Sequence, residues 1–226
     1  LEADKYQALV IGHQGANFCA GANLANMIQA IEASAWDQMN DTIKQLQDLT
    51  QRIRFSKAPV VAAPHHLTLG GGFELIAPAA HRVAAGELYI GAVEVGVGLI
   101  PGAGGNLRLI LNLMENSGKG RINAFQVSQK AFETIGFAKV ATSADEAKFL
   151  GYLLKSDTVI INNDHRILAA KQKALAMVND GYKPPQYRDD LKLPGTGGRT
   201  AMAMALKGFK AQGKISSYDE LIAKKL

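Results

Sequence analysis

Three consecutive glycines, Gly70, Gly71 and Gly72, constrain the fold of this chain more than any other feature. Glycine at this density usually means that the backbone turns sharply or that another molecule approaches it closely. The segment joins a predicted strand to an apolar run, Phe73 to Ala80, that predicts a short buried helix. Its amides would lie at a helix N-terminus, where free N–H groups and the helix dipole favour an anion. The glycines therefore predict a site for a phosphate or for a developing oxyanion.

Predicted strands and helices alternate through the first part of the chain, which indicates an α/β architecture. Short apolar runs that predict strands lie at residues 6–12, 59–63, 82–85 and 88–91. Ser34 and Asp37 form a capping-box pattern before a long helix. The apolar residues of this helix recur every three or four positions and are expected to form one buried stripe. The stripe comprises Trp36, Met39, Ile43, Leu46, Leu49 and Ile53.

The later part of the chain is expected to be mostly helical. Ser143 and Glu146 form a second capping-box pattern, and Gly151 stands where that helix would end. A helix is also expected at residues 106–114, a short strand at 158–161, a mobile loop at 183–198, and helices near 164–178, 200–212 and 217–225.

Composition excludes several classes of protein. With 47% hydrophobic residues over 226 positions, the chain can bury the core of one large domain. Its apolar runs are too short to span a bilayer, and the contiguous Lys/Arg clusters typical of nucleic-acid binding are absent. The single cysteine, Cys19, cannot form an internal disulfide, which favours a reducing, cytoplasmic location.

Two carboxylates, Glu74 and Glu94, stand in otherwise apolar stretches near the glycines. A carboxylate in such a place is costly unless it meets a partner or lines a functional cavity. The alternative is that each one caps a neighbouring backbone amide. A phosphate loop is excluded because GxxxxGK[ST] is absent, and a serine hydrolase is disfavoured because there is no GxSxG elbow. No Cys/His/Asp spacing suggests a metal site.

Three motifs together resemble the crotonase superfamily, and within it the enoyl-CoA hydratases. They are AGANL at residues 20–24, GGGFEL at 70–75 and IGAVEVGVGLIPGAGG at 90–105. The helical remainder resembles the C-terminal hydratase-type domain of bacterial 3-hydroxyacyl-CoA dehydrogenases of fatty acid oxidation. The resemblance implies a crotonase-like ββα spiral core over residues 1–140 and a C-terminal helical region over 141–226 that serves oligomerisation.

The resemblance also implies a mechanism. The amides of Ala22 and Gly71 would form an oxyanion hole for the thioester oxygen. Glu74 would activate a water for attack at C3, and Glu94 would exchange the proton at C2. The implied reaction is hydration of trans-2-enoyl-CoA to 3-hydroxyacyl-CoA in β-oxidation, and the presence of both glutamates favours it. The alternatives are a Δ3–Δ2 enoyl-CoA isomerase and a non-catalytic acyl-CoA-binding module.

The same resemblance assigns the coenzyme contacts. Ala20, Ala22, Asn23 and Leu24 would line the adenine pocket of a coenzyme A thioester, which is the substrate, and no covalently bound cofactor is implied. Asn23 replaces the aspartate usual in the family, with little expected effect on the fold. Four basic residues are solvated charges or contacts for the coenzyme phosphates, namely Lys119, Arg121, Lys207 and Lys210.

The remaining expectations concern packing and partners. Cys19 and His81 are expected to be structural, and His65 and His66 to have packing or surface roles rather than to line the ligand pocket. The resemblance implies a homotrimer or hexamer. It also implies that the chain is part of a longer protein, with an upstream dehydrogenase domain and with N-terminal strands of the crotonase core that are not found here.

Overall fold

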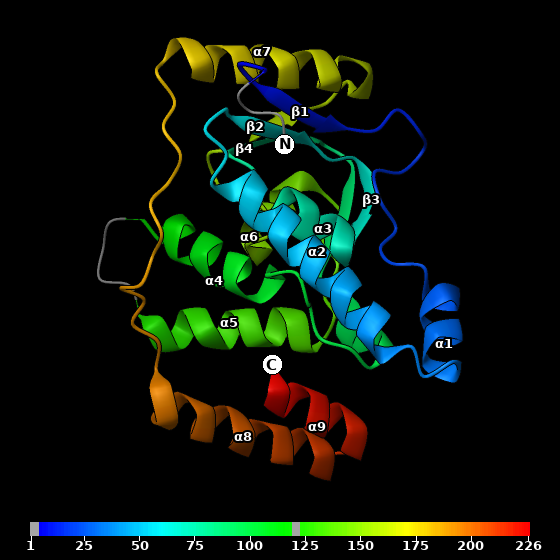
Figure 1. Ribbon diagram of the computed structural model, residues 1–226. Coiled ribbons are helices and arrows are strands. Elements are labelled where there is room, and N and C mark those ends of the chain that lie inside the picture. The colour runs from blue at the N-terminus through cyan, green and yellow to red at the C-terminus, as the bar shows by residue number, and fades with distance from the viewer. Residues whose placement is uncertain (1–4, 119–122) are drawn as a thin grey trace.

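The computed structural model describes residues 5–118 and 123–226 and centres on a parallel four-stranded sheet (Figure 1). Its strands lie in the order β1 (Leu9–Gly12), β2 (Val60–Ala63), β4 (His81–Ala85) and β6 (Thr158–Ile160). A second, two-stranded sheet pairs β3 (His66–Leu69) with β5 (Leu88–Gly91), also in parallel. The predicted α/β architecture is confirmed. Because β6 pairs with β4 across residue 140, both parts of the chain build the main sheet, and the division into two regions stays a prediction.

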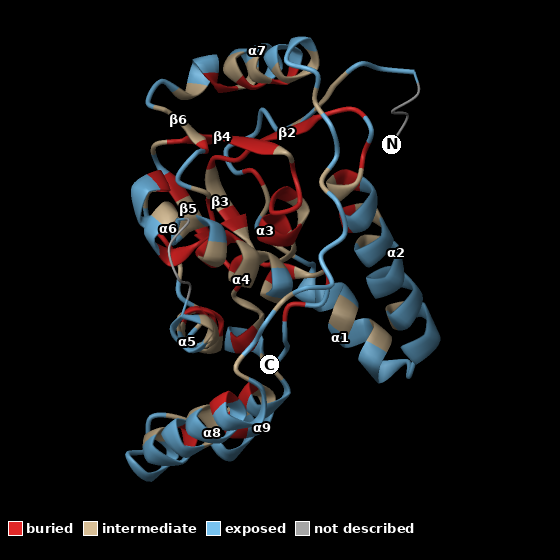
Figure 2. Ribbon diagram, turned by 90° about the vertical axis from the view of Figure 1, so that its left-hand side faces the viewer, coloured by how far each residue is buried: buried red, intermediate tan, exposed pale blue. Residues whose placement is uncertain are grey.

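Helices cover both faces of this sheet. The helix α7 (Arg166–Asn179) packs on β1, β2 and β4, and Figure 1 shows α2 (Trp36–Arg54), α3 (Gly71–Ile76) and α4 (Gly105–Asn116) on the other side. Every residue of β2 is buried, as expected for a parallel strand covered on both faces. Each fully buried Val, Leu or Ile side chain stabilises the fold by about 1.5–3 kcal/mol. Figure 2 shows that the buried residues concentrate in β2, β4 and α3.

The capping box predicted at Ser34 is wrong. A helix that the sequence analysis missed, α1 (Leu24–Glu32), ends just before it, and Ser34 turns the chain between α1 and α2 with a positive φ of 52°. The helix α2 begins at Trp36 without a side-chain cap.

The buried stripe predicted along α2 is only partly correct. Ile53 is 2% exposed and belongs to the core, whereas Trp36 is 54% exposed and Ile43 is 43% exposed. The reason is geometric, because the first turns of α2 extend past the sheet towards α1 and only the last turns reach the core (Figure 2).

The remaining helices are α5 (Ala124–Gly136), α6 (Ala144–Leu150), α8 (Gly195–Ala211) and α9 (Ser217–Lys225). The Ser143 hydroxyl caps α6 by accepting from the Glu146 amide, and Gly151 ends that helix in the left-handed conformation, as predicted. The carboxylate of Glu146 accepts from Thr142 rather than from Ser143, so the second half of that capping box is absent. No helix in the described ranges is long and apolar enough to cross a membrane.

Candidate active site

The loop that precedes α1 runs alongside β3. Cys19 pairs with Thr68 in parallel, and the Leu69 amide donates to the Cys19 carbonyl at 2.9 Å. At Gly21, where φ is 98°, a Cβ atom would lie 3.2 Å from the Leu69 carbonyl oxygen. This close approach carries the next residue, Ala22, to the C-terminal end of β3, where α3 begins.

The three glycines at the start of α3 have different environments. Gly70 has a φ of 54°, and a Cβ there would lie 3.2 Å from Oε1 of Glu94. At Gly72 a Cβ would lie 2.8 Å from the Cβ of Cys19. At Gly71 no atom of another described segment lies within 4 Å of that position, so neither packing nor backbone conformation explains this glycine. The open space beside Gly71 is available to a ligand.

Two predicted oxyanion donors border this space. Gly71 is the first residue of α3, so its N–H group has no acceptor within the helix. Among the described residues, neither this amide nor that of Ala22 donates a hydrogen bond to the protein. Both are therefore free to donate to a bound oxygen atom.

Glu74 is buried on α3, where Oε1 accepts two hydrogen bonds of 2.8 Å from the amides of Ala103 and Gly105. Burial raises the pKa of Glu74 above its ordinary value, and these backbone hydrogen bonds oppose part of the rise. The capping alternative is thus correct for one oxygen of Glu74. The PGAGG segment at residues 101–105 entered the sequence prediction only as part of a family motif, and its role in holding this carboxylate through its amides was not foreseen.

Glu94 begins the 3₁₀ helix η1 (Glu94–Val97) and has a different environment. Its Oε2 is buried with no hydrogen-bond partner among the described residues. Burial, together with a smaller effect of the negative charge of Glu74, raises the pKa of Glu94 to about 7. The two carboxyl groups therefore interact, and one of them can gain or lose a proton near neutral pH.

The AGANL loop lies at the surface. Ala20, Ala22, Asn23 and Leu24 are all exposed. Asn23 is the N-cap of α1, where its Oδ1 accepts from the amides of Ala25 at 3.0 Å and Asn26 at 3.2 Å. The amide side chain thus supports the local fold, as expected.

The two structural histidines act as predicted. His65 is 1% exposed, and its Nε2 lies 2.8 Å from the Gly15 carbonyl oxygen, which holds the loop before Cys19. His81 contacts the Thr158 hydroxyl at 2.9 Å, and burial lowers its pKa to about 4.

The four basic residues considered as phosphate contacts differ in what the structure shows. Lys119 and Arg121 lie outside the described residues. Lys210 pairs with Glu220 at 2.7 Å, so its ammonium group already has an anionic partner, whereas Lys207 is exposed.

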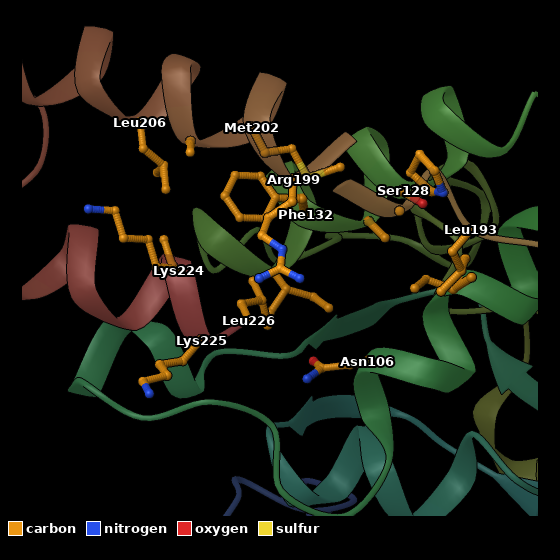
Figure 3. Close-up of a pocket in the computed structure, with 17 residues that line it drawn as sticks. Asn106, Ser128, Phe132, Leu193, Arg199, Met202, Leu206, Lys224, Lys225 and Leu226 are labelled. Atoms are coloured by element: carbon orange, nitrogen blue, oxygen red, sulfur yellow. The ribbon is translucent and has the colours of Figure 1, made fainter. Parts of the chain in front are cut away.

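A cavity of about 670 Å³ opens between α4 and α5 on one side and α8 and α9 on the other (Figure 3). It does not contain the two glutamates, but Asn106, which follows the Gly105 amide bound to Glu74, forms part of its wall. Most of its other walls are apolar. They include Ile110, Phe132, Ile135, Met202 and Leu206.

Comparisons with known proteins all identify proteins of one family. The family described as enoyl-CoA hydratase/isomerase matches residues 1–173. A relative from Bacillus subtilis (strain 168) named "Probable 3-hydroxyacyl-CoA dehydrogenase" is 43% identical over 98% of this chain, which spans only 27% of that relative. The crotonyl-CoA hydratase of Syntrophomonas wolfei is 34% identical over 45% of this chain and 37% of its own length.

Solved structures of similar fold confirm the crotonase-like architecture. An enoyl-CoA hydratase from Polaromonas sp. JS666 has a TM-score of 0.60 at 21% identity, over 97% of this chain and 71% of that chain. The enoyl-CoA hydratase from Thermoplasma volcanium GSS1 has a TM-score of 0.56 at 24% identity over the same shares, 97% and 71%.

Proposed function

Because this chain belongs to the enoyl-CoA hydratase/isomerase family, we propose that it adds water across the 2,3 double bond of a trans-2-enoyl-CoA thioester to give 3-hydroxyacyl-CoA. The observation that carries this proposal is the pair of interacting carboxyl groups of the buried Glu74 and the half-buried Glu94 beside free backbone amides. Hydration needs a base and an acid at neighbouring carbon atoms, and such a pair supplies both.

In the proposed mechanism the amides of Ala22 and Gly71 donate to the thioester oxygen, which gains negative charge as the enolate forms. Glu74, fixed through Oε1, takes a proton from a water molecule through its other oxygen, and the hydroxide adds to C3. Glu94, whose pKa of about 7 keeps it partly protonated at neutral pH, delivers a proton to C2. The two glutamates have exchanged protonation states at the end and are reset through solvent.

The position of the thioester in this mechanism also sets where the coenzyme and the acyl chain would lie. The exposed AGANL loop would hold the coenzyme, and the acyl chain would extend past Asn106 into the cavity between α4, α5, α8 and α9. Narrowing that cavity with Leu206→Trp should lower kcat/KM for long-chain substrates while crotonyl-CoA is still hydrated. Loss of both activities in a folded variant would contradict this route for the acyl chain.

The biological setting is proposed from the relatives. The match to a dehydrogenase several times longer than this chain suggests that the hydratase unit follows a dehydrogenase domain and acts in fatty acid β-oxidation. A homotrimer or hexamer in the cytoplasm remains part of this proposal.

Δ3–Δ2 isomerisation is a second candidate, favoured by one observation. Of the two glutamates, only Glu94 has a buried oxygen without a partner, and a single carboxyl group suffices to move a proton within the substrate. In that case Glu74 would serve to hold the loop at Ala103 and Gly105.

A spectrophotometric assay with crotonyl-CoA and with a 3-enoyl-CoA separates the two candidates. For a hydratase, Glu74→Gln and Glu94→Gln should each lower hydration by about 10²–10⁴-fold with the fold preserved. The matched control is Glu115→Gln, at an exposed position on α4, which should keep the parent rate. An isomerase would convert the 3-enoyl-CoA, hydrate crotonyl-CoA poorly and tolerate Glu74→Gln. Absence of both activities alongside coenzyme A binding would support a non-catalytic binding module.

A further inference from the structure

Arg82, on the buried strand β4, is incompletely satisfied. It is 1% exposed, its Nε donates to Asp157 at 2.7 Å, and its Nη1 donates to the carbonyl groups of Ala77 and Ala79. Its Nη2 is buried with no hydrogen-bond partner among the described residues. A buried N–H group of a charged side chain is costly when it lacks an acceptor.

Two more arginines lie on the neighbouring helices. The Thr50 hydroxyl donates to the Ala103 carbonyl at 3.0 Å, which seats α2 against the start of α4. Arg54 follows Thr50 by one turn of α2, and Arg108 follows the N-cap Gly104 by one turn of α4. Each arginine therefore lies one helical turn past the contact between Thr50 and Ala103. Both are half-buried, and within the described ranges neither makes a hydrogen bond or an ion pair.

The electrostatics of this region are unbalanced. Burial, together with the smaller effects of the positive charges of Arg54 and then Arg82, lowers the pKa of Arg108 to about 10. Arg108 is also the fourth residue of α4, close to the positive end of the helix dipole. Asp157 already binds Arg82, and Glu115 is exposed and attracts Arg54 without an ion pair. Among the described residues, only Arg82 of these three mutually repelling cations has a carboxylate partner, the buried Asp157.

Stabilisation of the α2 C-terminus does not account for this arrangement. A cation near the last carbonyl groups is favourable, but Arg52 in the same turn is exposed and serves that purpose in water. Nothing in the helix dipole explains Arg108, which stands at the opposite, positive end of its own helix.

We propose that Arg54, Arg82 and Arg108 form a binding site for a small oxyanion of the phosphate or carboxylate type. Planar guanidinium groups bind such anions through paired N–H donors, and the unpartnered Nη2 of Arg82 supplies a buried one. The site lies at the C-terminal end of α2, whereas the AGANL loop and α1 lie at its other end (Figure 1). It is therefore separate from the proposed coenzyme loop.

The test is calorimetric titration of the chain with inorganic phosphate and, separately, with acetate, at constant ionic strength set with chloride. We expect saturable binding of one of these anions and a rise in Tm in its presence. Arg108→Gln and Arg54→Gln should each weaken the binding about tenfold or more, equivalent to about 1.4 kcal/mol. The exposed Arg52→Gln is the matched control and should bind like the parent chain. Arg108→Lys keeps the positive charge but loses the paired N–H donors of the guanidinium group, and should bind the anion with intermediate affinity.

Three results would overturn the proposal. One is a Tm rise that is equal in the parent chain, Arg52→Gln and Arg108→Gln, since it would mark a general salt effect. A second is the absence of saturable heat with both anions in the folded parent chain. A third is a concentration-dependent dimer that Arg108→Gln abolishes without any anion binding, since a carboxylate side chain of a second copy would then occupy the cluster.

Discussion

Oε1 of Glu94 lies so close to Gly70 that a Cβ on Gly70 would come within 3.2 Å of it. Gly70 also donates its amide to the Gly91 carbonyl at 2.8 Å. The turn that opens α3 and the segment that carries the unpaired carboxyl group are therefore held in direct contact. This contact links the position of the proposed acid to that of the oxyanion donors.

Replacing Gly70 with alanine should damage both stability and activity. The residue has φ 54° and ψ −122°, a conformation that costs a residue with a Cβ about 1–3 kcal/mol. The added methyl group would also push against Glu94. Urea unfolding should show a lower midpoint, and kcat for hydration should fall. An unchanged midpoint would mean that the turn relaxes without strain.

Gly71→Ala and Gly72→Ala form a matched pair with opposite expectations. At Gly72 the new Cβ meets Cys19 at 2.8 Å, so this variant should lose about 1–3 kcal/mol of stability. At Gly71 the methyl group enters open space, so the variant should keep its Tm but lose activity where the substrate needs that space. Equal Tm losses in the two variants would contradict the difference in packing.

The raised pKa of Glu94 predicts a specific pH dependence. Because its pKa is about 7 in the folded chain against an ordinary 4.5, the folded state binds more protons than the unfolded state between these values. Stability from this group is therefore present below pH 4.5 and is lost as the pH rises towards 7. The Tm difference between Glu94→Gln and the parent chain should shift in favour of the variant over this range. A difference that does not vary with pH would contradict the assigned pKa.

Asn23→Ala should remove the cap of α1 and destabilise the chain by about 1 kcal/mol. Asn23→Asp keeps an acceptor oxygen at the same place and should retain most of the stability. Chemical denaturation of the three proteins provides the comparison. If the alanine and aspartate variants have the same free energy of unfolding, the two hydrogen bonds to Oδ1 contribute little to stability.

Asp157→Asn should be the most destabilising of these substitutions. It removes the carboxylate that pairs with Arg82 in the described part of the chain and leaves that guanidinium charged and buried, at a cost of about 3–5 kcal/mol. Circular dichroism melting measures the loss. The exposed pair Lys44 and Asp48 gives a control, since Asp48→Asn should change stability by less than about 1 kcal/mol.

The sequence predicted the parts of the fold that are set by local pattern. The apolar runs at β2, β4 and β5 and the cap at Ser143 carry their own signals, and the glycines at residues 70–72 marked the helix start. The capping box at Ser34 failed because α1 ends there and the backbone turn outweighs the local motif.

Other features depend on contacts between distant segments. The exposure of Trp36 depends on where α2 extends past the sheet, which periodicity does not encode. The same limit applies to the site, since no spacing predicts that PGAGG amides hold Glu74 while Glu94 stays unpaired. The group formed by Arg54, Arg82 and Arg108 was missed for the same reason, because its members come from α2, β4 and α4.

Trp36 gives the chain an intrinsic spectroscopic probe. It is the only tryptophan, and it stands exposed at the junction of α1 and α2, a short distance along the chain from the AGANL loop. Indole fluorescence shifts to shorter wavelength when water is replaced by apolar surroundings. Unlabelled protein can therefore report, through its own emission, when a coenzyme, a neighbouring subunit or another part of a longer polypeptide covers this end of the molecule.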